Sequence, residues 1–460
     1  MTDVDVAIIG AGASGVLVAG HLSRTAPSLS AAVLDAGARA ARGLAYGTPY
    51  GAHLLNVPAG RMSAFEDDSE HFTRWLTDRN AGASGKVFAP RSLYGEYLAG
   101  VLAQTCTPPS RVTRISGTAV GLTHDLETGA WRIHLHDGRT LVARSVVLAL
   151  GNLPPADPLT FKHGAPENYL SDPWAPGAAQ GLAAQSVILL IGTGLTMIDL
   201  VLALRAEGHR GVVHAISRRG HLPRAHAPHL PRPVEAPDAL SPRLTLRWIR
   251  DEITTAARQG HDWRSVIDAL RPYTHELWRS WTTPQRRSFL RHARVLWDVH
   301  RHRSAPEVAD QIEALIGEGA LVIHSGRVEG IRDEPPEVEV TWIERNHGRR
   351  QVLRVARVIN CTGPASDYAA IDLPLVAQLR RAGWLVPDTL RLGIETDAQG
   401  RLVGSDGAIV PGLFTIGPLR RSSLWESTAI PEIREQASAL ASLLASDASR
   451  RQTGTTKTSA

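Results

Sequence analysis

Cysteine is scarce in this chain of 460 residues, which contains only Cys106 and Cys361. The two lie far apart in the sequence, and neither belongs to a Cys-x-x-Cys pair. This scarcity argues against a zinc site and against enzymes that use a redox dithiol, and it indicates a reducing compartment. Lysine is also rare, so nearly all the positive charge is carried by arginine, which grips carboxylates and phosphates through a rigid fork of N–H donors.

Several functional signatures are missing as well. The chain has no Gly-x-Ser-x-Gly, His-Glu-x-x-His or Gly-x-x-x-x-Gly-Lys motif, so hydrolase, zinc-protease and kinase functions have no support. Residues 4–20 lack a basic leader, and the apolar residues 186–206 include two glycines and Asp199, so neither stretch predicts a signal peptide or a membrane span. A net charge of only +5 does not indicate nucleic-acid binding. We therefore expect a cytoplasmic protein with small-molecule partners, no metal, no nucleic acid and no membrane.

The most informative stretch is an apolar run that ends in Gly-x-Gly-x-x-Gly at Gly10, Gly12 and Gly15. In a strand that turns directly into a helix, Gly10 permits the turn, Gly12 lets a pyrophosphate approach the backbone, and Gly15 lets the helix pack closely. A second apolar run ends in Asp35, where a carboxylate can accept hydrogen bonds from a ribose. A tight turn in an unrelated α/β domain is the alternative, and it does not explain Asp35. The pattern predicts a dinucleotide site.

The same plan appears again further along the chain. Residues 187–191 form an apolar run that enters a helical pattern through Gly192 and Gly194, and a strand follows at 212–216. A strand that ends at Gly151 follows the first glycine turn, and a similar strand that ends at Gly363 follows the second; both are apolar enough to be buried. The sequence therefore predicts an α/β fold with two Rossmann-like nucleotide-binding domains and a mainly helical insert at about 241–316.

The second unit departs from the first in two ways. Met197 stands where a third glycine would be, and the second strand ends in Ser217, Arg218 and Arg219 instead of an acid. A hydroxyl and two guanidiniums would bind a 2′-phosphate that a carboxylate would repel, which favours NADPH over NADH. The alternative is two solvated surface arginines.

The insert is rich in arginine and tryptophan. A set of charged residues recurs at three- and four-residue steps and is expected to share one helix face: Arg287, Arg291, Arg294, Asp298 and His302. One interpretation is a solvated face with an Arg294–Asp298 pair. The other is a clamp for an anionic substrate, in which His300 or His302 acts as an acid–base group and tryptophans interleave the arginines. The residues concerned are Arg286, Arg287, Arg291, Arg294, Arg301 and Arg303, with Trp278, Trp281 and Trp297.

Several longer blocks resemble a known family. They are residues 54–63 (Leu-Leu-Asn-Val-Pro-Ala-Gly-Arg-Met-Ser), 192–196, 217–220, 297–303 and 360–364. These blocks are similar to a bacterial group of FAD/NAD(P)-binding flavoproteins with two dinucleotide-binding domains. Some members of that group are flavin-dependent N-hydroxylases, including the aspartate N-monooxygenase that forms nitrosuccinate.

The resemblance implies an FAD domain interrupted by an NAD(P)H domain. It divides the chain into an FAD domain at 1–180 and 320–445, an NAD(P)H domain at 181–319, and a disordered tail at 446–460. The implied FAD residues are Gly10, Gly12, Ser14, Gly15, Asp35 and Gly417, and the implied NADPH residues are Gly192, Gly194, Thr196, Ser217, Arg218 and Arg219. Asn56, Arg61 and Met62 would lie beside the isoalloxazine as candidate catalytic residues, and the last helix would aim its N-terminus at the flavin. Pro418 stands where the family usually has an acid, so one expected FAD contact is missing.

These observations together predict an FAD-dependent enzyme reduced by NADPH. The expected reaction is monooxygenation by O₂, through a flavin C4a-hydroperoxide, that hydroxylates a small, amino-acid-like and acidic substrate at nitrogen. Arg291, Arg294 and His300 are the candidate substrate residues. An NAD(P)H-dependent reductase or dehydrogenase and a non-catalytic nucleotide-binding protein remain alternatives, and the oligomeric state stays open.

Overall fold

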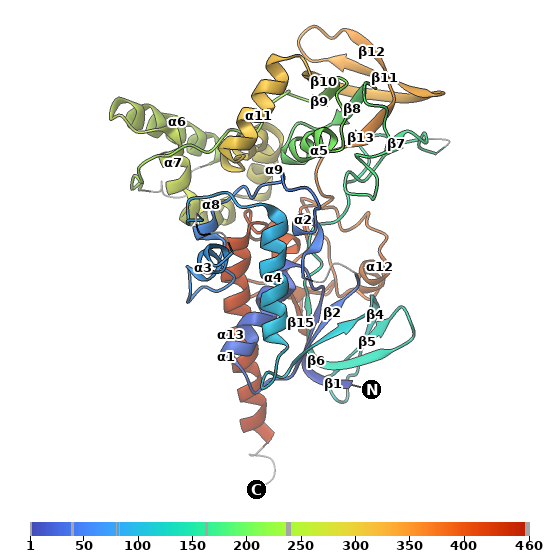
Figure 1. The fold of residues 1–460 in the computed structure, drawn as a ribbon. Helices are drawn as coiled ribbons and strands as arrows, with labels where there is room; N and C mark the ends of the chain where they lie inside the picture. The colour runs from blue at the N-terminus through green and yellow to red at the C-terminus, as the bar shows by residue number, and fades with distance from the viewer. Residues whose placement is uncertain are drawn as a thin grey trace.

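The computed structural model contains two mainly parallel sheets, one in each lobe of the molecule (Figure 1). It describes residues 2–455 except 38–40, 80, 82, 162–163 and 236–240. The sequence alternates apolar strands with helices, and parallel strands need such crossovers, which then cover the faces of the sheet. The predicted α/β class is confirmed by this arrangement.

The first sheet is built from both ends of the chain. Its strands, in spatial order, are β14 (Arg401–Val403), β15 (Ile409–Thr415), β6 (Thr140–Leu148), β1 (Thr2–Ile9), β2 (Ala31–Asp35) and β3 (Val112–Ser116). The antiparallel strands β4 (Ala119–His124) and β5 (Trp131–Leu135) extend it beside β6. Ala7 and Ile8 of β1 are fully buried, because a central parallel strand is covered on both faces.

Helices cover both faces of this first sheet. On one face lie α1 (Ala13–Thr25), α4 (Arg91–Thr105) and the long α13 (Ile430–Thr455), which share one hydrophobic core with the strands. The other face packs against β4, β5 and α12 (Pro374–Arg381). Short elements lie in the loops between them: α2 (Gly43–Tyr46), η1 (Ala59–Arg61), α3 (His71–Thr77) and η3 (Gly417–Ser422).

The second sheet follows the same plan. Its strands, in spatial order, are β12 (Arg350–Val355), β11 (Glu337–Glu344), β10 (Leu321–Glu334), β9 (Val213–Ser217), β8 (Ile188–Ile191), β13 (Arg357–Asn360) and β7 (Tyr169–Leu170). The strands β7 to β10 are parallel, whereas β11 and β12 form an antiparallel hairpin on β10. The helices α5 (Leu195–Ala206) and α11 (Pro306–Gly317) pack on this sheet.

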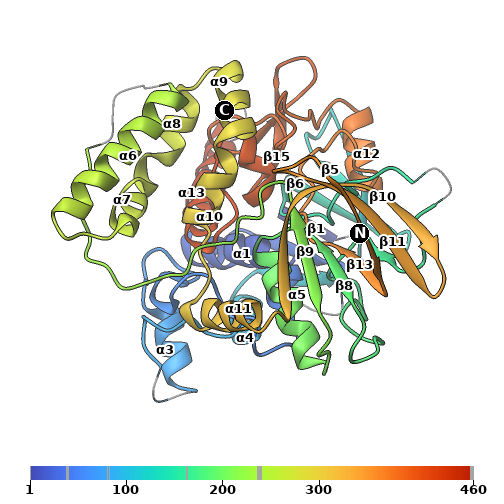
Figure 2. The same cartoon turned by 90° about the horizontal axis from the view of Figure 1, so that it is seen from above.

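The helical insert lies to one side of both sheets (Figure 2). Its elements are α6 (Pro242–Arg258), α7 (Trp263–Ala269), η2 (Arg271–Tyr273), α8 (Thr274–Ser280), α9 (Thr283–His292) and α10 (Arg294–Arg301). Trp278, Trp281 and Phe289 form its core together with Trp425, a residue from the far end of the chain. In the described part of the chain, no helix is both long and apolar enough to cross a membrane.

Strand pairing corrects the boundaries expected from the sequence. Residues 321–360 were assigned to the first domain, yet β10 to β13 pair within the second sheet. Val308 and Ile312 bury α11 against that sheet, so the insert ends with α10 rather than near residue 316. Periodicity identifies strands and helices but does not say which sheet a strand joins, because that is decided by contacts distant in sequence.

The expected disorder from residue 446 is wrong for its first part. The helix α13 continues to Thr455. Ala445 and Ala448 pack against the first core, and the hydroxyls of Ser446 and Ser449 donate to carbonyls four residues earlier, which satisfies polar groups without breaking the helix. Residues 456–460 lie outside the described residues.

Candidate functional site

The first glycine turn joins β1 to α1 at the carboxyl edge of the first sheet. Gly10 has φ +112°, and a Cβ added there would lie 2.4 Å from the carbonyl oxygen of Ala149. A Cβ on Gly15 would lie 1.9 Å from the carbonyl oxygen of Gly10, so the helix can approach the turn only without a side chain. Gly12 differs from both, because among the described residues its Cβ would meet only Gly43 Cα, at 3.8 Å. The turn is therefore tight at Gly10 and Gly15 and open at Gly12, where a pyrophosphate would approach.

The N-terminus of α1 fits an anion. No side chain caps it, and its first turn contains no acidic residue, so its N–H groups and its positive dipole end are available to a phosphate. Ser14 and Gly417 lie beside it: a Cβ on Gly417, which has φ +77°, would lie 2.9 Å from Ser14 Oγ. Gly417 N–H donates to Gln436 Oε1 at 3.0 Å, and thereby ties this corner to α13. Pro418 follows inside η3 and offers no carboxylate.

Several buried polar side-chain atoms near the start of α13 also lack a hydrogen-bond partner among the described residues. They include Ser427 Oγ, Arg434 Nε and Gln436 Nε2. Buried polar groups are nearly always paired in native proteins. Together with the open side of Gly12, these orphaned atoms show that the residues present fit a dinucleotide cofactor.

Asp35 ends β2, as predicted, and its side chain is nearly buried. One carboxylate oxygen accepts from Gly37 N–H at 3.2 Å, and the other is 2.9 Å from the Arg114 guanidinium of β3. A ribose would therefore share this carboxylate with Arg114. Sequence reasoning missed Arg114 because it belongs to no motif and reaches Asp35 only through the pairing of β2 with β3.

The loop that contains Asn56, Arg61 and Met62 lies between the two lobes, and these residues face different surroundings. The carbonyl of Asn56 accepts a hydrogen bond from His226 Nε2 at 3.0 Å. Burial, and then Arg303, lower the pKa of His226 to about 4, so the ring is neutral and donates at neutral pH. Met62 is 2% exposed and packs in the first core, which places its side chain in the packing behind the loop.

The same loop is fastened to the second lobe at α5. His53 Nε2 lies 2.7 Å from the carbonyl of Asp199, and Arg91 pairs with the Asp199 carboxylate at 2.6 Å. Burial lowers the pKa of His53. The neutral ring then donates from Nε2 to the carbonyl and accepts from the Thr48 hydroxyl at Nδ1. All these groups are buried or nearly so, so the loop and the start of α5 are held together firmly.

The second glycine turn joins β8 to α5. Gly192 has φ +122°, and a Cβ there would lie 2.3 Å from the carbonyl oxygen of Cys361 at the end of β13. A Cβ on Gly194 would meet no described atom within 4 Å, and the first turn of α5, which includes Thr196, has no acidic residue. Met197 is completely buried in the second core. The open, uncapped N-terminus at Gly194 therefore matches the first site even though Met197 replaces the third glycine.

Ser217 ends β9 beside this turn, but its hydroxyl is already committed. Thr193 Oγ1 donates to the carbonyl of His221 at 2.7 Å, so the 2.8 Å contact between Thr193 and Ser217 must use the hydrogen of Ser217. Ser217 Oγ also accepts from Gly220 N–H at 3.0 Å. The hydroxyl thus holds the turn together and has no hydrogen left for a phosphate, contrary to the role expected from the sequence.

The two arginines that follow are differently placed. Arg218 is exposed, and Arg219 donates to the carbonyl of His292 at 3.3 Å. A third arginine, Arg345, reaches the same corner and donates to the carbonyl of Arg218 at 3.3 Å. No sequence pattern pointed to Arg345.

The expected single helix face of the insert does not form. The helix is interrupted at Ala293, where α9 ends and α10 begins, so Arg287 and Arg291 belong to one helix and Arg294 to the next. Arg287 and Arg291 are exposed. The three- and four-residue spacing from Arg287 to His302 crosses this break. The sequence around Ala293 contains no proline or glycine that would predict a break there.

Arg294 and His300 make local contacts on α10. Arg294 Nε lies 3.3 Å from an Asp298 carboxylate oxygen, as in the surface-pair interpretation, and its guanidinium lies 5.9 Å from the Trp425 ring centroid. His300 Nδ1 donates to the Leu296 carbonyl at 2.7 Å. The tryptophans pack together and line a small apolar cavity that also includes Trp425. That cavity offers no charged group to an anion.

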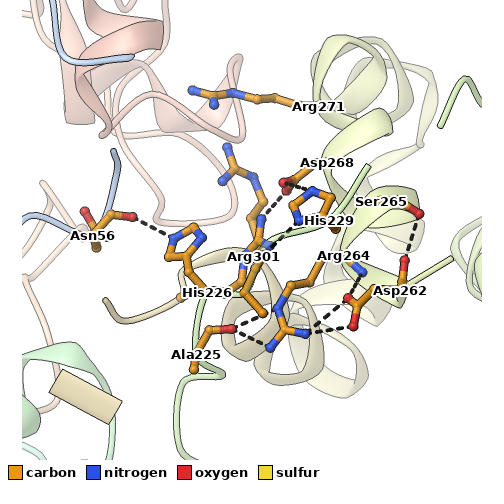
Figure 3. A network of polar contacts seen from close by, with 12 residues as sticks. Asn56, Ala225, His226, His229, Asp262, Arg264, Ser265, Asp268, Arg271 and Arg301 are labelled. Atoms are coloured by element: carbon orange, nitrogen blue, oxygen red, sulfur yellow. Dashed lines mark hydrogen bonds and ion pairs between the residues drawn. The ribbon is translucent and has the colours of Figure 1, made fainter. Parts of the chain in front are cut away.

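A buried ionic network, which the sequence did not reveal, joins the insert to α13 and to the loop. Arg301 pairs with Glu426 at 2.7 Å and with Glu432 at 3.4 Å, and Arg271 pairs with Glu432 at 2.7 Å. Deeper in the insert, Arg303 pairs with Asp268, which also lies 3.1 Å from His229. Figure 3 shows the part of this region where His226 reaches Asn56 and His229 lies beside Asp268, which joins segments far apart in the sequence.

Two sheets, each with an open glycine turn at the carboxyl end of a central strand, define the fold of flavoproteins with two dinucleotide-binding domains. A family model described as FAD-NAD(P)-binding matches residues 7–153, from β1 to just beyond β6. The match confirms that this segment is of the FAD-NAD(P)-binding type. Comparison with curated protein sequences found no match.

Solved structures with the same fold extend over nearly the whole chain. An ornithine N-hydroxylase from Kutzneria sp. 744 has a TM-score of 0.67 at 16% identity, over 98% of this chain and 100% of that one. An L-lysine 6-monooxygenase from Pseudomonas syringae has a TM-score of 0.67 at 18% identity, over 96% and 99%. A cadaverine monooxygenase from Erwinia amylovora has a TM-score of 0.63 at 14% identity, over 96% and 94%. These likenesses establish the fold, so the predicted fold class and the predicted resemblance to N-hydroxylating flavoproteins are confirmed at that level.

Proposed function

We propose that this protein is a cytoplasmic, FAD-dependent and NADPH-reduced monooxygenase that hydroxylates a small, acidic, amino-acid-like amine at nitrogen. One observation carries the proposal: the loop expected beside the flavin is fastened by His53 and Arg91 to Asp199 of α5, the helix whose N-terminus would receive the second nucleotide. Hydride transfer requires two cofactors in contact. Buried contacts between the two nucleotide units provide a fixed frame for that.

The first site would hold FAD through backbone and small side chains. Gly12 leaves room for the pyrophosphate, the N-terminus of α1 supplies N–H donors, and Asp35 accepts from the ribose. Ser14 and Gly417 close the corner between α1 and α13. Bound FAD would supply the redox chemistry, taking hydride from NADPH and passing the electrons to O₂.

The second site would hold NADPH at Gly192, Gly194 and Thr196, where the uncapped start of α5 faces the pyrophosphate. Arg218 and Arg219 would bind the 2′-phosphate, and Ser217 would support them through the turn that it holds together. The overall reaction balances as R–NH₂ + NADPH + H⁺ + O₂ → R–NHOH + NADP⁺ + H₂O. The chain's part is to orient the two cofactors and the amine and to keep bulk water away from them.

The acidic substrate rests on the arginine-rich insert. Of the candidate residues Arg291, Arg294 and His300, Arg294 has the strongest support, because it lies beside Trp425, which also contacts the half-buried Arg421 of η3. Burial, and then Arg294, lower the pKa of Arg421 to about 10, so the two guanidiniums are close enough to feel each other's charge. A substrate carboxylate between them would relieve that repulsion. Asn56 and Arg61 would border the reacting amine from the loop.

A stopped-flow experiment with purified holoprotein tests the proposal. NADPH should bleach the bound flavin within the time of a turnover, and mixing with O₂ and an acidic amine should give about one hydroxylamine per NADPH oxidised. Stoichiometric H₂O₂ with every amine in a panel of acidic, neutral and basic substrates would instead favour an NAD(P)H oxidase or reductase. Flavin that NADPH does not bleach would point to a non-catalytic nucleotide-binding protein.

A further inference from the structure

The corner at the carboxyl end of β9 gathers arginines from two separate elements. Arg218 and Arg219 follow β9 directly, whereas Arg345 begins the turn of the β11–β12 hairpin. The backbone N–H of Arg345 donates to the carbonyl of Ser325 at 2.9 Å, and Ser325 is the register partner of Ser217. Arg345 therefore lies across β10 from the end of β9, where the sequence predicts a 2′-phosphate.

These three arginines have no carboxylate partner among the described residues. Arg219 and Arg345 donate only to backbone carbonyls, those of His292 and Arg218, at 3.3 Å each. Several exposed arginines of the second sheet do pair with acids, as Arg350 does with Glu329 at 3.1 Å and Arg332 with Glu339 at 2.6 Å. A cluster of guanidiniums without a counter-ion is typical of an anion site.

The neighbourhood of His221 shows the same excess of positive charge. Burial lowers the pKa of His221 first, and Arg219, Arg224 and Arg345 lower it further. All three of these side chains are cationic. Ser217 cannot donate to an anion, since its hydroxyl hydrogen is used by Thr193.

From this arrangement we infer that Arg345 is the third guanidinium of the 2′-phosphate site and a determinant of the preference for NADPH over NADH. The inference rests on the proposed function, because it deepens the nucleotide specificity of the same site. Arg345 enters from the hairpin side of the sheet, opposite Arg218 and Arg219, so the phosphate would be held between β9 and the β11–β12 turn. Its donation to the Arg218 carbonyl aligns the two elements before the ligand binds.

Calorimetric titration of the FAD-loaded protein with 2′,5′-ADP and with 5′-AMP separates the phosphate contact from the rest of the nucleotide. In Arg345→Ala, binding of 2′,5′-ADP should weaken by about tenfold or more, as expected for one lost charge-assisted contact. Binding of 5′-AMP should stay within about twofold of the wild-type value. Arg345→Lys should recover part of the loss, because charge is kept while the bidentate fork is lost.

Two control variants bracket this result. Arg350→Ala removes an exposed arginine from the same hairpin and should leave both affinities unchanged. Ser217→Ala should change the affinities for 2′,5′-ADP and 5′-AMP by the same factor, because the Ser217 hydroxyl holds the turn together. The inference is overturned if Arg345→Ala weakens both ligands equally, which would make Arg345 a support for Arg218, or if it weakens neither. A wild-type protein that does not prefer 2′,5′-ADP also overturns it. Selective 2′,5′-ADP binding without NADPH-driven flavin reduction would instead reject the proposed function and leave the inference intact.

Discussion

Individual glycines in the first turn serve different purposes, although the motif treats them alike. Gly10 and Gly15 are required by contacts within the fold, at 2.4 and 1.9 Å from backbone carbonyl oxygens for an added Cβ. An added Cβ on Gly12 would meet no atom within 4 Å in the described part of the chain other than Gly43 Cα. A side chain at Gly12 would therefore interfere with cofactor binding and not with folding, whereas a side chain at Gly15 would interfere with folding itself.

This difference makes a direct prediction for Gly12→Leu and Gly15→Ala. Gly12→Leu should give colourless protein that still folds, because the side chain fills the pyrophosphate's place without a clash in the chain. Gly15→Ala should be insoluble, or its apoprotein should melt far below the wild-type apoprotein, since even one methyl group forces α1 away from the turn. The ratio of flavin to protein absorbance and the thermal midpoint of the apoprotein measure both effects. A yellow Gly12→Leu protein with normal FAD content would remove the first turn from the cofactor site.

Secondary-structure elements decide which charged residues can act together in the insert. Arg291 precedes the break at Ala293 and lies on the exposed surface of α9, whereas Arg294 follows the break and lies near Trp425. A periodic pattern across the break therefore suggests a common face that does not exist. Of the proposed clamp, the contacts of α10 support Arg294 and offer nothing for Arg291.

Kinetics of the paired variants Arg294→Ala and Arg291→Ala test this division. Arg294→Ala should raise the KM for an acidic substrate about tenfold, the effect of losing one charge-assisted contact, and leave the rate of flavin reduction by NADPH unchanged. Arg291→Ala should stay within about twofold in both, as expected for a solvated surface residue. A KM unchanged from wild type in both variants would reject the clamp, and slower flavin reduction in Arg294→Ala would indicate a structural role.

At the scale of the whole molecule, the insert is attached to the first lobe by buried charges. Arg301 is 12% exposed at its side chain and faces Glu426 and Glu432, which are 6% and 7% exposed. Burial would lower the pKa of Arg301, but the two glutamates raise it above its ordinary value. Burial would likewise raise the pKa of Glu426, and Arg301 nevertheless holds it below its ordinary value. Arg301 and Glu426 are therefore both ionised, and each depends on the other.

Arg301→Met should loosen the insert, because removing one partner leaves buried carboxylates uncompensated, at a cost of about 3–5 kcal/mol. The tryptophan-rich insert allows its unfolding to be followed by fluorescence in urea, with the exposed Arg287→Ala as a control that should change little. The pKa of Glu426 is depressed, so its contribution to stability is present above the pKa of a free glutamate and is lost as the pH falls below it. The difference between Arg301→Met and wild type should narrow below about pH 4. Identical urea midpoints at neutral pH would show that the network does not hold the insert.

The sequence by itself determined the parts of this protein that depend on local geometry. Gly10, Gly12, Gly15 and Asp35 define the first turn, and Gly192 and Gly194 the second, because a strand that enters a helix through a tight turn places the same demand on the backbone wherever it occurs. Only the tertiary structure decided which strands share a sheet and that the Ser217 hydroxyl donates to Thr193. It also decided that Arg114 reaches Asp35, that Arg345 reaches Arg218 and that Glu432 joins the buried ionic network. Those contacts join residues distant in the chain, and no local period or propensity encodes the partner of a side chain that meets it only after folding.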